Sequence, residues 1–168
     1  MTGQNIVLTG MPGAGKSTIG VLLAKALGMS FLDTDLVIQE KEGCLLQEII
    51  NTRGVSGFIA VESSIIQQIE ADHCVIATGG SAIYDPKAVK HLQSMGRLYY
   101  LKLPYAEIEG RIRNMASRGI AIEKGQRLIG LYRGRTQLYE QYADMIVDCA
   151  GLSIEETVQK MIDLIRKA

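Results

Sequence analysis

Hydrophobic positions along the chain fall into two kinds of segment. Short apolar runs that end at glycine, proline or acidic residues predict buried strands over residues 5–9, 30–35, 73–77, 97–103 and 145–147. Segments with apolar residues at helical spacing predict helices over residues 17–27, 36–70, 105–113, 126–142 and 153–167. Breaks are expected in the second helical segment at Gly43 and over residues 54–57. Strands that alternate with helices predict an α/β fold in which helices cover both faces of a parallel sheet.

The composition fits one soluble globular domain over residues 1–168, because the chain is 47% hydrophobic and 21% charged and has no repeat or linker. Its three cysteines, Cys44, Cys74 and Cys149, are odd in number and lie among apolar neighbours. We therefore expect reduced thiols and a cytoplasmic location.

Charge and hydropathy argue against two classes of partner. Lys and Arg number 18 and Asp and Glu number 18, so no net charge favours nucleic acid or an anionic membrane. The first 15 residues are uncharged, but they lack a basic leader and are broken by glycines and Pro12. We expect neither a signal peptide nor a membrane span there.

The strongest motif, Gly10-Met-Pro-Gly-Ala-Gly-Lys-Ser17, follows a predicted strand and opens a predicted helix. This is the pattern of a phosphate-binding loop, in which glycines turn backbone amides toward phosphate, the lysine reaches the outer phosphates and the serine hydroxyl faces Mg²⁺. A chance glycine turn is the alternative. A dinucleotide-binding loop would need a third glycine, which is missing. The candidate nucleotide-binding residues are Gly13, Ala14, Gly15, Lys16, Ser17 and Thr18.

Two carboxylates, Asp33 and Asp35, lie at the end of the second predicted strand. From an extended backbone both would point the same way, toward the crevice at the carboxyl edge of the sheet. One could hold a Mg²⁺ water and the other could orient or deprotonate an acceptor hydroxyl. Alternatively, one of them caps the following helix, and both roles can coexist.

A glycine pair and a group of arginines add further candidates. Gly79 and Gly80 follow the third predicted strand and offer either open backbone at the same sheet edge or only a tight turn. Six arginines cluster late in the chain, and some should face phosphates because phosphoryl transfer depends on charge neutralisation. They are Arg111, Arg113, Arg118, Arg127, Arg133 and Arg135. Arg118 lies in residues 114–125, whose weak periodicity and glycines suit a mobile lid.

Taken in order, these motifs resemble the shikimate kinase family from end to end of the chain. The resemblance rests on residues 10–20, on residues 31–35, on Phe58 with Glu62, on Gly79-Gly80, and on Arg135-x-x-Leu138-Tyr139 with Ala143-Asp144. It implies a three-layer α/β/α P-loop kinase fold with a five-stranded parallel sheet and a lid over residues 114–125. It also implies transfer of phosphate from ATP, with Mg²⁺, to the 3-hydroxyl of shikimate.

The same resemblance assigns roles by position. Lys16 and Ser17 would bind phosphate and Mg²⁺, and Asp33 would hold a ligand or water of the metal without binding the metal itself. Asp35 would contact the acceptor hydroxyls, and Arg118 would be the arginine of the lid. Lys16, Asp35 and Arg118 are therefore the candidate catalytic residues. In the same way Arg111 would lie against the adenine, and Arg135 would bind the acceptor carboxylate. The implied acceptor-binding residues are Asp35, Gly79, Gly80 and Arg135.

The chain departs from the family pattern at three positions. Ile59 stands where the family has an arginine that pairs with the shikimate carboxylate, Ser81 replaces the third glycine of a triplet, and Gly119 replaces a proline after the lid arginine. Loss of a charged carboxylate partner could cost about 2–5 kcal/mol of binding. Arg135 alone, or Arg53, could compensate.

These departures leave the acceptor open. A kinase for another polyol, hydroxy acid or nucleoside monophosphate, and a nucleotide-binding protein with a degenerate acceptor site, remain alternatives. We expect a monomer that acts on a small-molecule hydroxyl acceptor.

Overall fold

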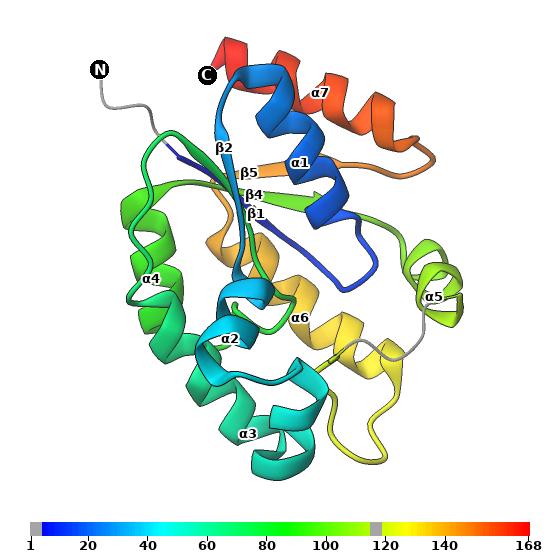
Figure 1. Ribbon diagram of the computed structural model, residues 1–168. Helices are drawn as coiled ribbons and strands as arrows, with labels where there is room; N and C mark the ends of the chain where they lie inside the picture. Colours follow the sequence, from blue (N-terminus) through cyan, green and yellow to red (C-terminus); the bar gives the residue numbers. More distant parts are fainter. Residues whose placement is uncertain (1–4, 115–118) are drawn as a thin grey trace.

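The computed structural model describes residues 5–114 and 119–168 as a five-stranded sheet surrounded by helices (Figure 1). The sheet has the order β2-β3-β1-β4-β5, and each of its four strand pairings is parallel. Its strands are β1 (Asn5–Thr9), β2 (Ser30–Asp33), β3 (Cys74–Ala77), β4 (Gly96–Lys102) and β5 (Met145–Asp148). The helices are α1 (Lys16–Leu27), α2 (Thr34–Glu42), α3 (Leu46–Ile66), α4 (Pro86–Met95), α5 (Tyr105–Arg113), α6 (Leu128–Tyr142) and α7 (Ile154–Lys167).

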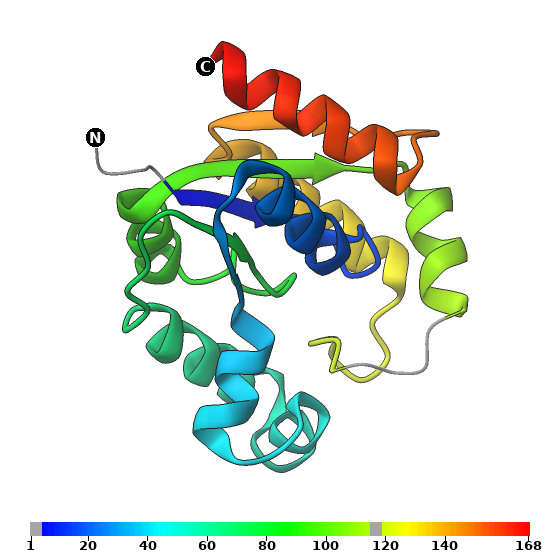
Figure 2. The same ribbon diagram turned by 45° about the horizontal axis from the view of Figure 1, so that its top comes forward.

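The sheet is covered on both faces. Helices α1 and α7 lie on one face, and α4 and α6 lie on the other (Figures 1 and 2). Side chains of the central strand β1 alternate accordingly: Ile6 and Leu8 pack in one core cluster with Leu23 of α1, whereas Val7 packs in another with Leu92 of α4. This burial on both faces explains why the strands are continuous apolar runs. The three-layer α/β/α fold with five parallel strands is confirmed.

Most expected helix ends are confirmed. Helix α1 ends at Gly28, whose φ of 69° is the left-handed conformation that favours glycine. Helix α7 begins with a capping box in which Ser153 and Glu156 bond each other's backbone amides. The expected elements omit α4, although Asp85 caps it by accepting a hydrogen bond from the amide of Lys87 at 2.9 Å.

The region expected as helix 36–70 is two helices. Helix α2 ends at Gly43, and α3 begins at Leu46 and bends at Gly54, where φ is 72° and ψ is 178°. Gly57 lies within the helix rather than at a break. Helix α2, the first part of α3 and residues 119–127 lie beyond the carboxyl ends of the strands (Figures 1 and 2). The end of α3 packs against the sheet, where Ile66 shares a core cluster with Val7. Within residues 5–114 and 119–168, no helix is both long and apolar enough to cross a membrane.

Candidate active site

The loop between β1 and α1 provides a cradle for an anion. Gly13 and Gly15 adopt positive φ angles of 82° and 88°, and Gly15 leads into α1 without a side chain that caps the helix. The first amides of α1 are therefore not satisfied by a cap, and the positive end of the helix dipole opens onto the cavity. Pro12, Gly13 and Gly15 line that cavity, whereas the Ala14 side chain is buried beneath the loop. These residues fit a polyphosphate.

Lys16 is held inside this loop. Only 8% of the residue is exposed, and its Nζ donates hydrogen bonds to the carbonyls of Gly10 at 2.7 Å and Met11 at 2.8 Å. Burial lowers the pKa of Lys16 to about 8 from an ordinary value of 10.5, while the nearby Asp35 carboxylate opposes that change. Lys16 is thus a poorly solvated cation at the phosphate end of the cavity.

The two aspartates differ in structure from the prediction. β2 ends at Asp33, and Asp35 lies in the first turn of α2. The expectation that both carboxylates extend from a strand was therefore wrong, because Asp33 caps α2 by accepting from the Asp35 amide at 2.9 Å. Asp33 also accepts a hydrogen bond from the Ser17 hydroxyl at 2.6 Å. The capping role and a position beside Ser17 coexist in one carboxylate.

Asp35, in contrast, lines the cavity beside Lys16. Burial and then the negative charge of Asp33 raise the pKa of Asp35 to about 6, while Lys16 opposes the rise. The Asp35 carboxylate is therefore mostly ionised at neutral pH and more basic than an ordinary aspartate. Such a group can orient an acceptor hydroxyl and take up its proton.

A single cavity of about 710 Å³ connects these groups. At one end lie Gly13, Gly15, Lys16, Ser17 and Thr18. At the other end lie residues that come from α2, α3, the turn after β3, residues 119–121 and α6: Asp35, Phe58, Glu62, Gly79, Gly80, Ser81, Gly119, Ile120, Ala121 and Arg135. The cavity thus brings together most of the sequence-predicted residues of both ends. Ala14 and Asp33 do not line it, although Asp33 contacts Ser17, and Arg118 lies outside the described residues.

Arg135 is buried to 1% exposure at the far end. Its Nε donates to the Tyr84 hydroxyl at 3.0 Å, and its Nη2 donates to the Ala121 carbonyl at 2.8 Å. A Cβ on Gly80 would lie only 2.7 Å from Nη1, so glycine is required for this approach. Among the ion pairs of residues 5–114 and 119–168, none involves Arg135. A buried guanidinium in this state is suited to bind an anion.

Glu62 and Ser81 form a pair that sequence reasoning missed as site residues. The Ser81 hydroxyl donates to Glu62 Oε1 at 2.6 Å, and both residues are buried. In the sequence, Glu62 is indicated only by the family resemblance, and Ser81 only as a departure from it. A lone acid one helical turn after Phe58, within an apolar stretch of α3, was the available indication.

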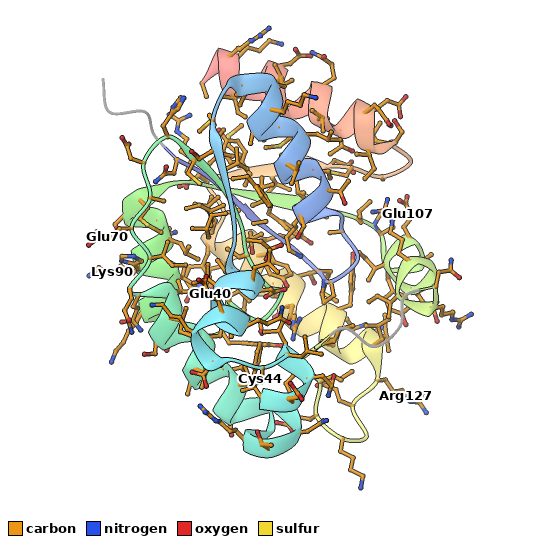
Figure 3. The ribbon with its side chains drawn as sticks, viewed as in Figure 1. Glu40, Cys44, Glu70, Lys90, Glu107 and Arg127 are labelled. Atoms are coloured by element: carbon orange, nitrogen blue, oxygen red, sulfur yellow. The ribbon has the colours of Figure 1, made fainter. Side chains whose placement is uncertain are left out.

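The remaining arginines separate into two groups. Arg111 lines the cavity and donates to the Gly13 carbonyl at 3.0 Å, near Ser153 and Ile154 at the start of α7. Arg113 pairs with Glu109 on the surface, and Arg127 points away from the body of the molecule (Figure 3). Arg133 is likewise exposed. Only part of the predicted arginine group therefore faces the cavity.

No second cation from position 59 or from Arg53 reaches the cavity. Ile59 packs against an apolar cluster that contains Phe58 and does not line the cavity. Arg53 pairs with Glu42 at 2.8 Å, with half of its side chain exposed, so the compensation expected from Arg53 is not found. Within the described part of the chain, the cations that line the cavity are Lys16, Arg111 and Arg135.

Comparison with known proteins agrees with this geometry. The sequence model of the family described as shikimate kinase matches residues 12–166. A shikimate kinase from Nitrosomonas europaea is 35% identical, covering 98% of this chain and 79% of that protein. A shikimate kinase from Francisella tularensis subsp. holarctica is 36% identical, covering 94% of this chain and 92% of that protein.

A solved structure matches closely as well. A shikimate kinase from Acinetobacter baumannii, in complex with shikimate, superimposes with a TM-score of 0.87 at 30% identity and covers 99% of this chain and 94% of that chain. A phosphate-binding loop at the carboxyl edge of a parallel sheet, joined by one cavity to a buried acid and guanidinium, defines an ATP-dependent small-molecule kinase. The chain belongs to the shikimate kinase family. Enzymes of this family use ATP and Mg²⁺.

Proposed function

We propose that this protein transfers the γ-phosphoryl group of ATP to a hydroxyl of shikimate. The observation that carries the proposal is the single cavity that holds the phosphate loop at one end and Asp35 with Arg135 at the other. Family membership supports the same reaction. A compact acidic polyol is an acceptor whose hydroxyl and carboxylate such a cavity can hold at once.

The nucleotide end would be built from the glycine loop and α1. Amides from Gly13 to Thr18 would meet the phosphates, and Lys16 would follow the charge that develops on the transferred group. Arg111 would border the adenine with Ser153 and Ile154.

Ser17 and Asp33 fit a Mg²⁺ site, because a hydroxyl oxygen and a carboxylate oxygen lie 2.6 Å apart beside the loop. When bound, Mg²⁺ would neutralise phosphate charge. Asp33 is fixed by its cap on α2, so the carboxylate is already oriented toward Ser17.

At the acceptor end, Asp35 would orient the reacting hydroxyl and accept its proton, and Arg135 would hold the carboxylate beside Gly80. Tyr139 supports this arrangement, since its hydroxyl donates to the Gly80 carbonyl at 2.6 Å. We also propose that Arg118, from a lid over residues 114–125, completes the phosphate site as the third catalytic residue. A monomer in the cytoplasm is the proposed form, supported by a cavity lined within one chain and by three free cysteines.

The test is ATP-dependent ADP release measured across an acceptor panel that includes shikimate, gluconate and nucleoside monophosphates. We expect the highest kcat/KM with shikimate. A higher kcat/KM with any other acceptor would overturn the proposed substrate while leaving the kinase class intact.

A further inference from the structure

Glu62 has an unusual environment for a carboxyl group. It is 1% exposed on α3 and lines the cavity. Oε1 accepts the hydrogen bond from Ser81, but Oε2 is buried and has no hydrogen-bond partner among the described residues. Leaving a buried polar oxygen unpaired is costly, and more so when it is charged. A ligand in the cavity is a natural partner for this oxygen.

The free oxygen borders the acceptor end. A Cβ on Gly79 would lie 2.8 Å from Glu62 Oε2 and 2.8 Å from Asp35 Oδ1, so both carboxyl groups face the same small space. Glycine at this position keeps that space open. Arg135 approaches the next residue, Gly80, so the guanidinium lies at the same end.

The charges at the acceptor end of the cavity explain why a proton on Glu62 would favour binding of an acidic acceptor. With Asp35 and Glu62 ionised, two negative charges at this end face the single guanidinium of Arg135, while Lys16 lies at the phosphate end. An acidic acceptor then adds a further negative charge in a buried place, which is costly unless a positive charge accompanies it. In this chain Ile59 supplies none, and Arg53 is paired on the surface. A proton on Glu62 supplies the missing charge.

We propose that Glu62 is a specificity-determining residue that binds the acceptor carboxylate together with a proton, and that Ser81 positions it. The inference rests on the proposed function, because it requires an acceptor with a carboxylate. The proton on Oε2 is donated toward that carboxylate beside Arg135, while Oε1 keeps the hydrogen bond from Ser81. The proton is taken from solvent on binding and returned on release, and no covalent bond changes.

The groups around Glu62 place its titration near neutral pH. Burial raises the pKa of Glu62 to about 7 from an ordinary value of 4.5. The Ser81 hydrogen bond opposes this rise, Asp35 adds to it, and Arg135 and Lys16 oppose it. Above about pH 7, Glu62 loses its proton in the protein without acceptor, so acceptor binding must restore that proton. The Kd for the acceptor should therefore rise up to tenfold per pH unit above that point.

The experiment is calorimetry of shikimate binding, with a non-hydrolysable ATP analogue present, in two buffers of different ionisation enthalpy. We expect close to one proton taken up per shikimate at about pH 8 and little uptake at about pH 6. Glu62→Gln presents an amide donor without titrating, so proton uptake should vanish and the Kd should become nearly independent of pH. Glu70→Gln, which removes an exposed carboxylate outside the cavity, is the matched control and should keep the wild-type uptake.

Ser81→Gly tests the positioning role. Because the Ser81 hydrogen bond favours ionised Glu62, its removal should move the midpoint of the Kd profile to higher pH. An unchanged midpoint would overturn that role. Wild-type binding without proton uptake at about pH 8, or undiminished uptake in Glu62→Gln, would overturn the role of Glu62. Failure of the wild-type protein to bind shikimate at any pH would instead overturn the proposed function, and this inference with it.

Discussion

Lys16 carries its charge at a buried position where two backbone carbonyls accept hydrogen bonds from it. Its Nζ lies 2.7 and 2.8 Å from these oxygens, and burial already lowers its pKa to about 8. A cation so poorly solvated interacts strongly with phosphate charge, because little solvent screens it. Its contribution to the reaction should therefore be large.

Lys16→Ala should lower kcat by roughly 10³-fold or more, since electrostatic stabilisation carries most of phosphoryl transfer. Thermal unfolding of the variant should remain cooperative, which serves as the folding control. Near wild-type turnover in a folded Lys16→Ala protein would show that the loop is not the catalytic phosphate site.

Asp35→Asn removes a negative charge but keeps the size of the side chain. Turnover should fall by about 10²–10⁴-fold, the usual contribution of a general base, while ATP affinity changes little. Single-turnover kinetics together with calorimetric titration of ATP separate the two effects. Lost ATP affinity with unchanged chemistry would contradict the role assigned to Asp35.

Ile59→Arg introduces the cation that the family carries at this position. If the new guanidinium reaches the acceptor end beside Glu62, it can pair with the shikimate carboxylate. Shikimate binding at about pH 8 should then strengthen by roughly 1–3 kcal/mol, the usual contribution of a charged hydrogen bond. Steady-state KM values for shikimate measure this change. Weaker binding with a lower melting temperature would mean that the charge is buried in the apolar cluster around Phe58 instead.

At the scale of elements, the stretch over residues 119–121 lines the cavity and begins at Gly119. Its φ is 59°, and a Cβ there would lie 2.5 Å from Cβ of Leu46 on α3. A proline, with φ near −65°, cannot adopt this conformation. Glycine at this position thus permits a positive φ, which a proline does not, and a close contact with α3.

Gly119→Ala should destabilise the protein by about 1–3 kcal/mol, because it combines a positive φ with a steric clash. Gly130→Ala in α6 is the matched control, since a Cβ there meets nothing within 4 Å and alanine favours helix. Denaturant unfolding should show the two substitutions shifting stability in opposite directions. Equal stability of wild type and Gly119→Ala would refute the account of this contact.

The sequence predicted elements better than it predicted how side chains meet. Apolar runs and glycine ends located all five strands, since buried parallel strands and left-handed helix ends leave plain patterns. The start of α2 at Thr34 was missed because a capping aspartate resembles the acidic end of a strand. The Glu62–Ser81 pair joins α3 to the turn after β3, a contact that no local spacing contains. Likewise, nothing local indicated that Arg53 pairs with Glu42.

At the scale of the whole molecule, the buried acids link stability to pH. The pKa of Glu62 is about 7 in the folded protein, compared with an ordinary value of 4.5. Between about pH 4.5 and pH 7, the folded protein therefore holds a proton on this carboxyl group that the unfolded protein has lost. Stability contributed by this group is therefore present at low pH and falls as pH rises from about 4.5 through 7. Glu62→Gln should reduce this decline in denaturant titrations without ligand, and an identical pH dependence in both proteins would contradict the assigned environment.

Closure of the cavity is the second whole-molecule expectation. We predict that residues 114–125 act as a lid. In this segment, the Ala121 carbonyl accepts a hydrogen bond from Arg135. Hydrogen exchange over this stretch should slow when an ATP analogue and the acceptor are both bound. Equal protection in the free and bound proteins would refute a lid.

The most direct test of the account is the identity of the phosphorylated product. The protein is incubated with ATP, Mg²⁺ and shikimate, and phosphorus NMR follows the phosphate ester as ADP forms. The account predicts one ester on the 3-hydroxyl of shikimate for each ADP, and no ester with Lys16→Ala. Release of ADP without any phosphorylated shikimate, or an ester formed equally well by Lys16→Ala, would contradict it.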